Sequence, residues 1–286
     1  MSIDAAAQGS GAEQSEGQGR PFYITTPIYY VNDRPHIGHA YTTLACDVVA
    51  RFKRLDGFDT HFLTGTDEHG QKVEKSAAAA NTDPQDFCDR VAQNFRDMMP
   101  ILNVSNDDFI RTTEERHVRS VQALWQRLQE SGDIYLGSYS GWYAVRDEAF
   151  YGEDELTKQP DGTRTAPSGA EVEWVEEPSY FFRLSAWGDR LLAFYDANPD
   201  FIMPTARRNE VVSFVKGGLR DLSISRTSFN WGVPVPGDDA HIMYVWLDAL
   251  TNYMTAVGYP DTESELFGRF WPADVHMVGK DILRFH

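Results

Sequence analysis

The chain has 286 residues, of which 42% are hydrophobic, and its 43 acidic residues against 26 Lys and Arg give a formal net charge of −17. A chain of this length can fold as one large domain or as two domains of ordinary size. Its negative charge repels nucleic acid and anionic membrane surfaces on average, so any contact with nucleic acid must use a local basic patch. Its two cysteines exclude a disulfide scaffold and fit a reducing cytosol.

The N-terminal segment, residues 1–19, is rich in Ala, Gly, Gln, Ser and Glu, without a basic start or an apolar run. This composition predicts a disordered leader rather than a signal peptide. Elsewhere, no window approaches the roughly 20 apolar residues that a membrane span requires. We therefore expect a cytoplasmic protein with no membrane association.

A strand, a helix and a second strand are predicted next. Residues 22–30 are aromatic and β-branched, which favours a strand, and Pro27 interrupts it. Four apolar residues then recur at the spacing of an amphipathic helix: Leu44, Val48, Phe52 and Leu55. After Gly57, a second apolar run over residues 58–63 leads into the polar loop 64–70. This order favours a right-handed crossover and a parallel sheet, which binds ligands beyond the carboxyl ends of its strands.

The motif His36-Ile37-Gly38-His39 lies at the junction between the first strand and the helix. The first turn of a helix carries unpaired N–H groups and a partial positive charge, and Gly38 would let a phosphate approach the backbone closely. Two histidines three residues apart share one face of the helix, where both can donate hydrogen bonds to charge that develops in nucleotidyl transfer. The alternatives are surface or capping histidines, or half of a metal site.

The following segments predict two helices and then a region of different composition. Pro84 suits the first turn of a helix with the apolar stripe Phe87, Val91, Phe95 and Met98. Thr112 and Glu115 predict a capping box for a second helix, which ends at Gly132. From residue 134 to about residue 226, short aromatic runs are split by Gly, Pro, Asp and Thr, which predicts an inserted domain of mixed α/β character. Residues 243–247 and 275–281 predict two further strands.

Six blocks of residues resemble the bacterial methionyl-tRNA synthetases, in the order found in that family: 30–39, 65–70, 207–210, 221–226, 244–249 and 279–282. The histidine motif is common to all class I aminoacyl-tRNA synthetases, whereas the acidic loop and the blocks around Trp246 and Asp281 point to methionine. The resemblance implies a Rossmann-like (HUP) nucleotide-binding parallel sheet, truncated, and interrupted by a connective-peptide domain. Its divisions are 20–132 for the first half of the Rossmann domain, 133–226 for the insertion, and 227–286 for an incomplete second half.

The resemblance also implies an activity: ATP-dependent conversion of L-methionine to methionyl-adenylate, with Mg²⁺ arriving with ATP, and transfer of methionine to tRNA(Met). The positions that match ATP-binding residues are Asn32, His36, Gly38, His39, Gly279 and Asp281, of which His36, Gly38 and His39 are catalytic. The positions that match methionine-binding residues are Ile28, Tyr30, Asp67, Trp246, Ala249, Tyr253 and His286. Asp67 would bind the ammonium group and Asp281 a ribose hydroxyl.

Each of these assignments has a plainer alternative. Asp67 and Asp281 are also good helix N-caps, and Trp246 and Tyr253 could belong to the core. A basic patch for tRNA could comprise Arg207, Arg208, Lys216, Arg220 and Arg226, which could equally be structural ion-pair partners. At the level of the whole protein, another class I synthetase and a non-catalytic nucleotide-binding module remain open.

Two family features are missing from the sequence. The lysine-rich KMSKS loop has no counterpart before His286, so the resemblance implies a fragment of a longer protein, with very low activity on its own. Many relatives fold the insertion around a zinc knuckle of Cys-x-x-Cys pairs, but Ala144 and Asp147 occupy the first pair and no cysteine lies near residues 165–170. We therefore predict no zinc and no metal ligands, with an insertion held by aromatic residues: Trp142, Tyr143, Trp174, Tyr180, Phe181 and Phe182.

Overall fold

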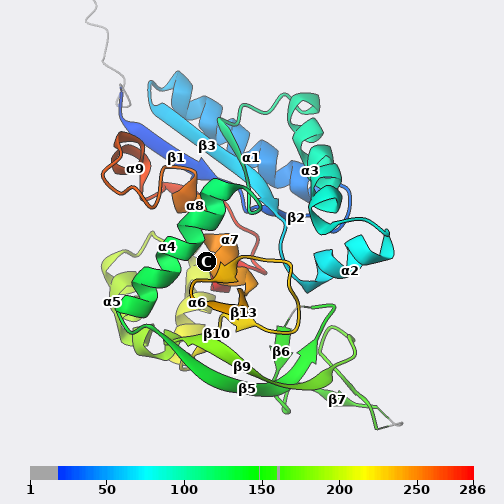
Figure 1. Ribbon diagram of the computed structural model, residues 1–286. Coiled ribbons are helices and arrows are strands. Elements are labelled where there is room, and N and C mark those ends of the chain that lie inside the picture. The colour runs from blue at the N-terminus through cyan, green and yellow to red at the C-terminus, as the bar shows by residue number, and fades with distance from the viewer. Residues whose placement is uncertain (1–18, 148, 160–161) are drawn as a thin grey trace, which may run out of the picture.

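The computed structural model describes residues 19–147, 149–159 and 162–286, so the leader predicted over residues 1–19 lies outside the described residues except for Gly19. A parallel sheet occupies one end of the molecule (Figure 1), with the strand order β14-β1-β3-β2 and with β4 paired to β3. Its strands are β1 (Pro21–Thr25), β2 (Tyr29–Tyr30), β3 (Asp59–Asp67), β4 (Asp108–Arg111) and β14 (Val275–His276). All four pairings are parallel, which confirms the predicted α/β class and its first crossover.

Helix α1 (Ile37–Leu55) connects β1 and β2 to β3, as predicted, but its apolar stripe faces outward. The buried positions are Thr43, Cys46, Asp47 and Ala50, which are small or polar. Of the four predicted apolar residues, Leu55 is 88% exposed and even Leu44, the least exposed, is 38% exposed. The inner face can be polar because the Asp47 carboxylate accepts hydrogen bonds from Ser105 N at 2.7 Å and from Arg51 Nε at 2.7 Å. Periodicity therefore located the helix correctly but not its buried side.

Three more helices pack around the sheet: α2 (Gln71–Ala79), α3 (Pro84–Ile101) and α4 (Glu115–Glu130). The start of α3 is as predicted, with Asp83 as the N-cap and Phe87, Phe95 and Met98 buried. The predicted capping box of α4 is wrong: Glu114 is its N-cap, and Thr112 Oγ1 instead accepts a hydrogen bond from Glu68 N at 2.9 Å. No helix in the described ranges is both long enough and apolar enough to cross a membrane.

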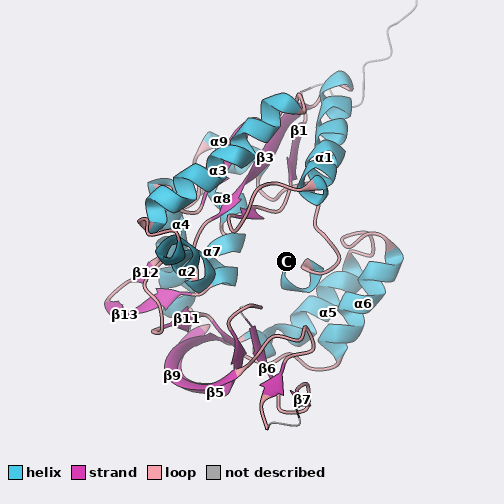
Figure 2. Ribbon diagram, turned by 90° about the vertical axis from the view of Figure 1, so that its right-hand side faces the viewer, coloured by secondary structure: helices cyan, strands magenta, loops and turns pink. Residues whose placement is uncertain are grey.

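The region after α4 forms a separate antiparallel layer at the other end of the molecule (Figure 2). A curled four-stranded sheet has the order β10-β9-β5-β6, and two helices, α5 and α6, lie beside it. The elements are β5 (Ile134–Ala144), β6 (Ala149–Tyr151), β7 (Thr157–Lys158), β8 (Arg164–Thr165), β9 (Glu173–Phe182), η1 (Leu184–Trp187), α5 (Gly188–Ala197), α6 (Thr205–Lys216) and β10 (Leu222–Ser223). This is the mixed α/β character that the sequence predicts.

The chain then returns toward the parallel sheet. It forms β11 (Ser225–Arg226), β12 (Pro234–Val235), β13 (Asp238–Met243), α7 (Val245–Leu250), α8 (Asn252–Thr255), α9 (Glu265–Phe270) and η2 (Leu283–Phe285). The strand predicted over residues 243–247 is wrong beyond Met243, because α7 begins at Val245. A short apolar run fits a buried helix and a buried strand equally well, and here tertiary packing selects the helix. Of the strand predicted over residues 275–281, only Val275–His276 forms a strand.

A glycine within β3 gives a test of how closely the parallel strands pack. A Cβ atom on Gly65 would lie 2.7 Å from Ile110 Cγ2 and would also collide with the Ile110 backbone. We expect Gly65→Ala in the full-length protein to lower the free energy of unfolding by about 1–3 kcal/mol, because the adjacent strand cannot move aside without losing its pairing. Urea denaturation measures this change. Gly268→Ala, where a Cβ atom meets nothing within 4 Å, is the control and should not destabilise.

Candidate functional site

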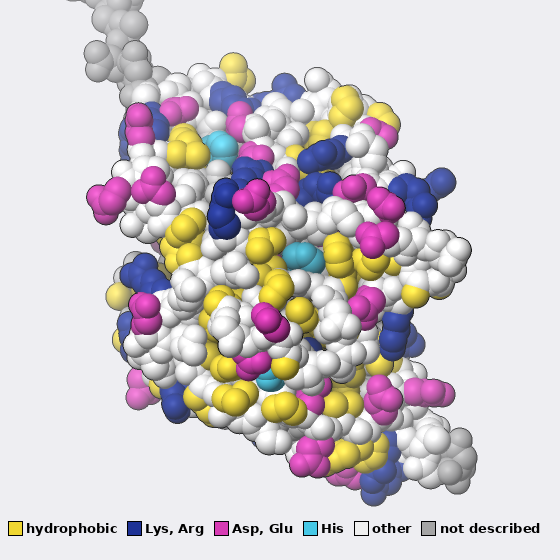
Figure 3. Space-filling model, in the orientation of Figure 1, with side chains coloured by type: hydrophobic (Ala, Val, Ile, Leu, Met, Phe, Trp, Pro, Cys, Tyr) yellow, Lys and Arg dark blue, Asp and Glu magenta, His cyan; other side chains and the backbone are white. Residues whose placement is uncertain are grey.

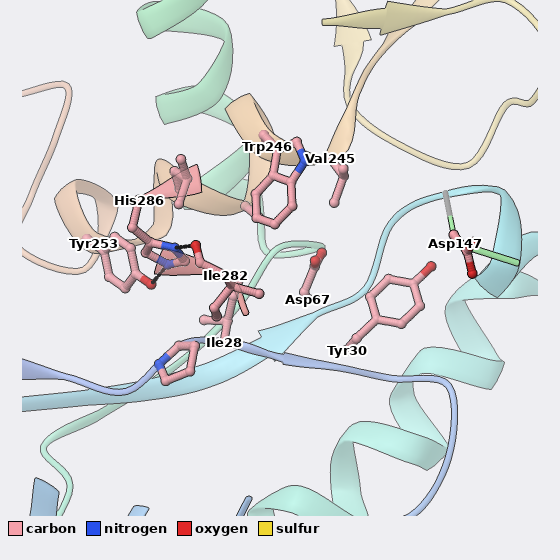
Figure 4. Close-up of a pocket in the computed structure, with 12 residues that line it drawn as sticks. Ile28, Tyr30, Asp67, Asp147, Val245, Trp246, Tyr253, Ile282 and His286 are labelled. Carbon is pink, nitrogen blue, oxygen red and sulfur yellow. Dashed lines mark hydrogen bonds between the residues drawn. The ribbon is translucent and has the colours of Figure 1, made fainter. Parts of the chain in front are cut away.

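A cavity of about 250 Å³ lies between the parallel sheet and the segment that follows β13 (Figure 4). Its lining includes all seven residues predicted to bind methionine: Ile28, Tyr30, Asp67, Trp246, Ala249, Tyr253 and His286. The other lining residues, which the sequence did not predict to bind methionine, are Pro27, Asp147, Val245, Leu250 and Ile282. Most of the wall is apolar, and one carboxylate, Asp67, lies at the end of a sheet strand. A small cavity with few polar groups suits a small ligand with one charged end.

The sheet register places Asp67 at the cavity. Asp67 is the last residue of β3 and is 8% exposed, and its Cα pairs with that of Tyr30 in β2. The alternative that Asp67 caps a helix is wrong, because Gly70 is the N-cap of α2. Asp67 lines the cavity, where a carboxylate can form a charge-assisted hydrogen bond with a cationic ligand.

The opposite wall comes from α7, α8 and the C-terminal segment. The Trp246 ring stacks on Phe285, with centroids 4.2 Å apart, and the Tyr253 hydroxyl lies 2.8 Å from His286 Nε2. Burial, and to a smaller degree the nearby Asp67 charge, raises the pKa of Tyr253 well above its usual value. The phenol therefore stays protonated and donates to His286. Tyr253 also belongs to a buried cluster with Tyr23 and Leu63, so the core alternative holds for it, and both Tyr253 and Trp246 line the cavity.

The histidine motif forms the N-terminus of α1 and caps it. Gly38 N donates to His36 Nδ1 and His36 N donates to His39 Nδ1, each at 3.1 Å, so the capping alternative is confirmed. The two imidazole rings stack with centroids 3.7 Å apart. Because each Nδ1 accepts a hydrogen bond, the proton of each neutral ring is on Nε2, which can donate to a ligand.

The charge state of His39 follows from its surroundings. Its ring lies against Tyr29 and Phe95, with centroid distances of 4.7 Å and 5.2 Å. Burial, followed by the proximity of His36, lowers the pKa of His39 to about 4. His39 is therefore neutral at physiological pH. Since Tyr29 precedes the Tyr30 that pairs with Asp67, strand β2 links the histidine motif to the cavity.

The other predicted ATP-binding residues lie outside the cavity lining. Asn32, Gly38, Gly279 and Asp281 are all exposed. The Asp281 carboxylate accepts a hydrogen bond from Lys280 Nζ at 2.8 Å, which lowers its pKa. Asp281 does not cap a helix, because η2 begins at Leu283 with Ile282 as its N-cap. The structure thus leaves these four residues exposed, but the cavity lining includes none of them.

The insertion contributes Asp147 to the cavity lining. No local sequence signal indicates that this residue lies at the cavity. Its carboxylate accepts hydrogen bonds from the Tyr151 hydroxyl at 2.9 Å and from Ser168 Oγ. At the positions where the resemblance implied a zinc knuckle, Ala144 packs in a buried cluster with Ala166 and Ala170. In the described part of the chain, no three His, Cys, Asp or Glu side chains are grouped to hold a metal ion.

The predicted aromatic support of the insertion is only partly correct. The rings of Trp142 and Trp174 are in edge contact, with centroids 5.3 Å apart, but Trp174 is 55% exposed. Tyr180 packs edge-on against Trp125 of α4, with centroids 5.2 Å apart, and so joins the insertion to the Rossmann-like part. Small alanines and a hydrogen-bonded carboxylate therefore hold the tip of the insertion together with the aromatics.

The candidate basic patch is mostly occupied by internal partners. Arg226 is buried, with its guanidinium 3.7 Å from the centre of the Tyr244 ring, so it belongs to no surface. Arg207 bonds to Glu210 at 2.6 Å and Arg208 donates to Tyr195 O at 2.9 Å. On the face drawn in Figure 3, Lys and Arg alternate with Asp and Glu rather than forming a wide basic area. The ion-pair alternative is therefore correct for these three arginines.

Comparison with known protein families identifies the family of this chain. Residues 22–286 match the family described as "tRNA synthetases class I (M)". The chain belongs to this family of class I synthetases. The resemblance seen in the sequence is thereby confirmed, together with the Rossmann-like fold class.

Relatives of the chain include methionine–tRNA ligases. The one from Rickettsia felis is 66% identical over 265 residues, which are 93% of this chain and 51% of the relative, and the one from Brucella suis is 61% identical over the same length. Among solved structures, Mycobacterium tuberculosis methionyl-tRNA synthetase in complex with methionyl-adenylate superposes with a TM-score of 0.90 at 59% identity, over 93% of this chain and 52% of that one. Its apo form superposes with a TM-score of 0.80. The chain spans about half the length of the relatives that it matches.

Proposed function

We propose that this chain carries the methionine-activating site of a methionine–tRNA ligase. The observation that carries the proposal is that seven residues, predicted from separate sequence blocks, line one small cavity with a buried carboxylate at a strand end. Asp67 would bind the ammonium group by a charge-assisted hydrogen bond. Trp246, Tyr253 and His286 would surround the side chain, since aromatic rings suit a polarisable thioether sulfur.

The reaction would take place between this cavity and the histidine motif. The methionine carboxylate attacks the α-phosphorus of ATP, a new P–O bond forms, and the bond to pyrophosphate breaks. No protein nucleophile is needed, so the protein contributes alignment of the two anions and neutralisation of charge. His36 and His39 would donate from Nε2 to the phosphates, Gly38 would allow adenosine to lie close to the backbone, and Asp281 would accept a ribose hydroxyl. Asn32 and Gly279 would complete the nucleotide site.

The remaining parts of the proposal concern the whole protein. Mg²⁺ would arrive with ATP, because phosphate oxygens and water supply most of its ligands in such sites. The activated methionine would pass to tRNA(Met), and the protein would act in the cytoplasm. Residues 20–132 and 227–286 would form two parts of the nucleotide-binding domain. Residues 133–226 would form the connective-peptide insertion, a division supported by the change from parallel to antiparallel pairing after α4.

Pyrophosphate exchange tests the activity directly. The full-length protein should exchange labelled pyrophosphate into ATP with L-methionine at a kcat/KM at least about tenfold above that with leucine, isoleucine, valine or cysteine, because even one methyl group changes binding by about 1–3 kcal/mol. Faster exchange with another amino acid would assign the chain to a different class I synthetase. Absence of exchange with every amino acid would favour the non-catalytic module.

Zinc content tests the predicted zinc-free insertion. We expect elemental analysis of the full-length protein to find well under about one zinc per chain, because Ala144 and Asp147 replace a thiolate pair. Incubation with a chelator should leave the thermal unfolding midpoint unchanged, since no structural metal would be removed. A stoichiometric zinc content, or a loss of stability with the chelator, would contradict this prediction.

A further inference from the structure

A buried carboxylate that the proposed chemistry does not use lies behind the methionine cavity. Asp248 is 1% exposed, and each of its oxygens faces an imidazole. Its Oδ2 lies 2.7 Å from His69 Nδ1, and its Oδ1 lies 2.8 Å from His117 Nε2. Both histidines are themselves buried. Three elements therefore meet at this carboxylate: the loop after β3, helix α4 and helix α7.

The carboxylate is held in its charged form. Burial alone disfavours ionisation of Asp248, but the charge of His69 and the hydrogen bonds from both histidines outweigh it and hold the pKa of Asp248 well below its usual range. A buried ionised group of this kind has a narrow range of favourable positions, because displacement of either partner leaves a charge unpaired. The contact is therefore suited to holding two segments at a defined separation.

The two segments that it joins carry opposite walls of the cavity. His69 follows Asp67 by two residues in the loop after β3. On α7, Trp246 precedes Asp248 by two residues and Ala249 follows it, and both line the cavity. Asp67, at the end of β3, lines the cavity, whereas His69, in the loop that follows, contacts Asp248 of α7. A hydrogen bond between residues 179 apart in sequence thus sets the separation of the two walls.

Other contacts hold the same loop to its own side of the molecule. Both Glu68 carboxylate oxygens accept hydrogen bonds from Arg111, at 2.7 Å and 2.8 Å. Trp231 Nε1 donates to Glu68 O at 2.6 Å, and Gly70 N donates to Trp231 O at 3.0 Å. The loop should therefore keep its fold when His69 is altered, while its position relative to α7 becomes less defined.

We propose that Asp248 and His69 are positioning residues for the amino acid, which fix the separation between the ammonium-binding carboxylate Asp67 and the side-chain wall at Trp246. This inference rests on the proposed methionine site and adds a determinant of its affinity. Neither residue lines the cavity. Their effect would act through the placement of Asp67 and Trp246, and not through contact with the ligand.

The test measures methionine and ATP binding separately in the full-length protein. His69→Ala removes the donor to Asp248, whereas His69→Asn keeps an N–H near the position of Nδ1. We expect His69→Ala to raise the calorimetric Kd for L-methionine about 10- to 100-fold, with less than about a twofold change in the KM for ATP. His69→Asn should restore the affinity to within about threefold of wild type, and Asp248→Asn should resemble His69→Ala.

Three comparisons make the outcome decisive. His61→Asn, within β3 and among Tyr23 and Phe270, is the control and should leave methionine affinity unchanged. Unchanged affinity in His69→Ala, or equal losses for ATP and methionine, would overturn the inference, and so would failure of His69→Asn to restore binding. If Asp248→Asn does not fold, the His69 pair still decides. Asp67→Asn distinguishes failure of the proposed methionine site from failure of the positioning role. Normal methionine binding in Asp67→Asn would refute the site itself. Weakened binding in Asp67→Asn together with normal binding in His69→Ala would refute only the positioning role.

Discussion

Replacing Asp67 by Asn in the full-length protein should weaken L-methionine binding by about 2–4 kcal/mol, or roughly thirtyfold to several hundredfold in Kd, because the amide cannot offer a negative charge to the buried ammonium group. The ATP affinity should change far less, since Asp67 lines the cavity on the side of the amino acid. Isothermal titration with each ligand measures both effects.

The control for this variant is the same substitution at the other end of the same strand. Asp59 begins β3 and pairs with Arg269 at 2.6 Å at the surface, so Asp59→Asn should leave methionine binding unchanged. An unaltered methionine affinity in Asp67→Asn would remove the ammonium-binding role. Equal losses in the two variants would indicate a general effect on the sheet.

Replacing His39 by Ala should lower kcat for methionine-dependent pyrophosphate exchange by about 10²–10³-fold, because one donor to the charge developing on the phosphates is lost. Methionine affinity should be retained, since His39 does not line the amino-acid cavity. Because the ring donates from Nε2, His39→Gln, whose amide can place an N–H near that position, should recover part of the loss. Steady-state exchange rates at saturating methionine and ATP measure the effect.

The pH dependence gives a second measure of the role of His39. With its pKa lowered to about 4, the ring is already neutral at pH 6, and its titration should produce no change in kcat/KM between pH 6 and 8. If the imidazolium were the active form, the rate would fall as the pH rises from about 4 and would be low at neutrality. A decline in kcat/KM between pH 6 and 8 that is caused by titration of His39 would therefore contradict donation by the neutral ring.

The sequence was most informative about residues whose position follows from the strand or helix in which they lie. Asp67 and Tyr30 lie at the ends of strands, and parallel strands bring their carboxyl ends to one edge. Trp246, Ala249 and Tyr253 recur at helical spacing, so the correct face follows once one of them is placed. Trp246 itself lay within residues 243–247, which were predicted as a strand, whereas α7 begins at Val245. The capping role of His36 was recognised as an alternative, and the structure shows that capping leaves Nε2 available to donate.

The errors share a cause, which is that burial and pairing depend on neighbours distant in sequence. The apolar stripe of α1 faces outward because the sheet side is filled by small residues and by Asp47, whose partner Ser105 lies 58 residues away. Thr112 Oγ1 accepts a hydrogen bond from Glu68 N, in the loop after β3, instead of capping α4. Arg226, expected on a basic surface, is enclosed by Tyr244 and the strands of the insertion.

The sequence by itself therefore determined the class of fold, the family and seven of the residues that line the cavity, because these depend on motifs in which spacing and residue type act locally. Only the tertiary structure decided which helix faces are buried, that Asp147 of the insertion reaches the cavity, and that Asp248 lies between His69 and His117. The physical reason is that a buried charge is stable only where separate elements supply its partners, and periodicity within one element carries no information about those partners.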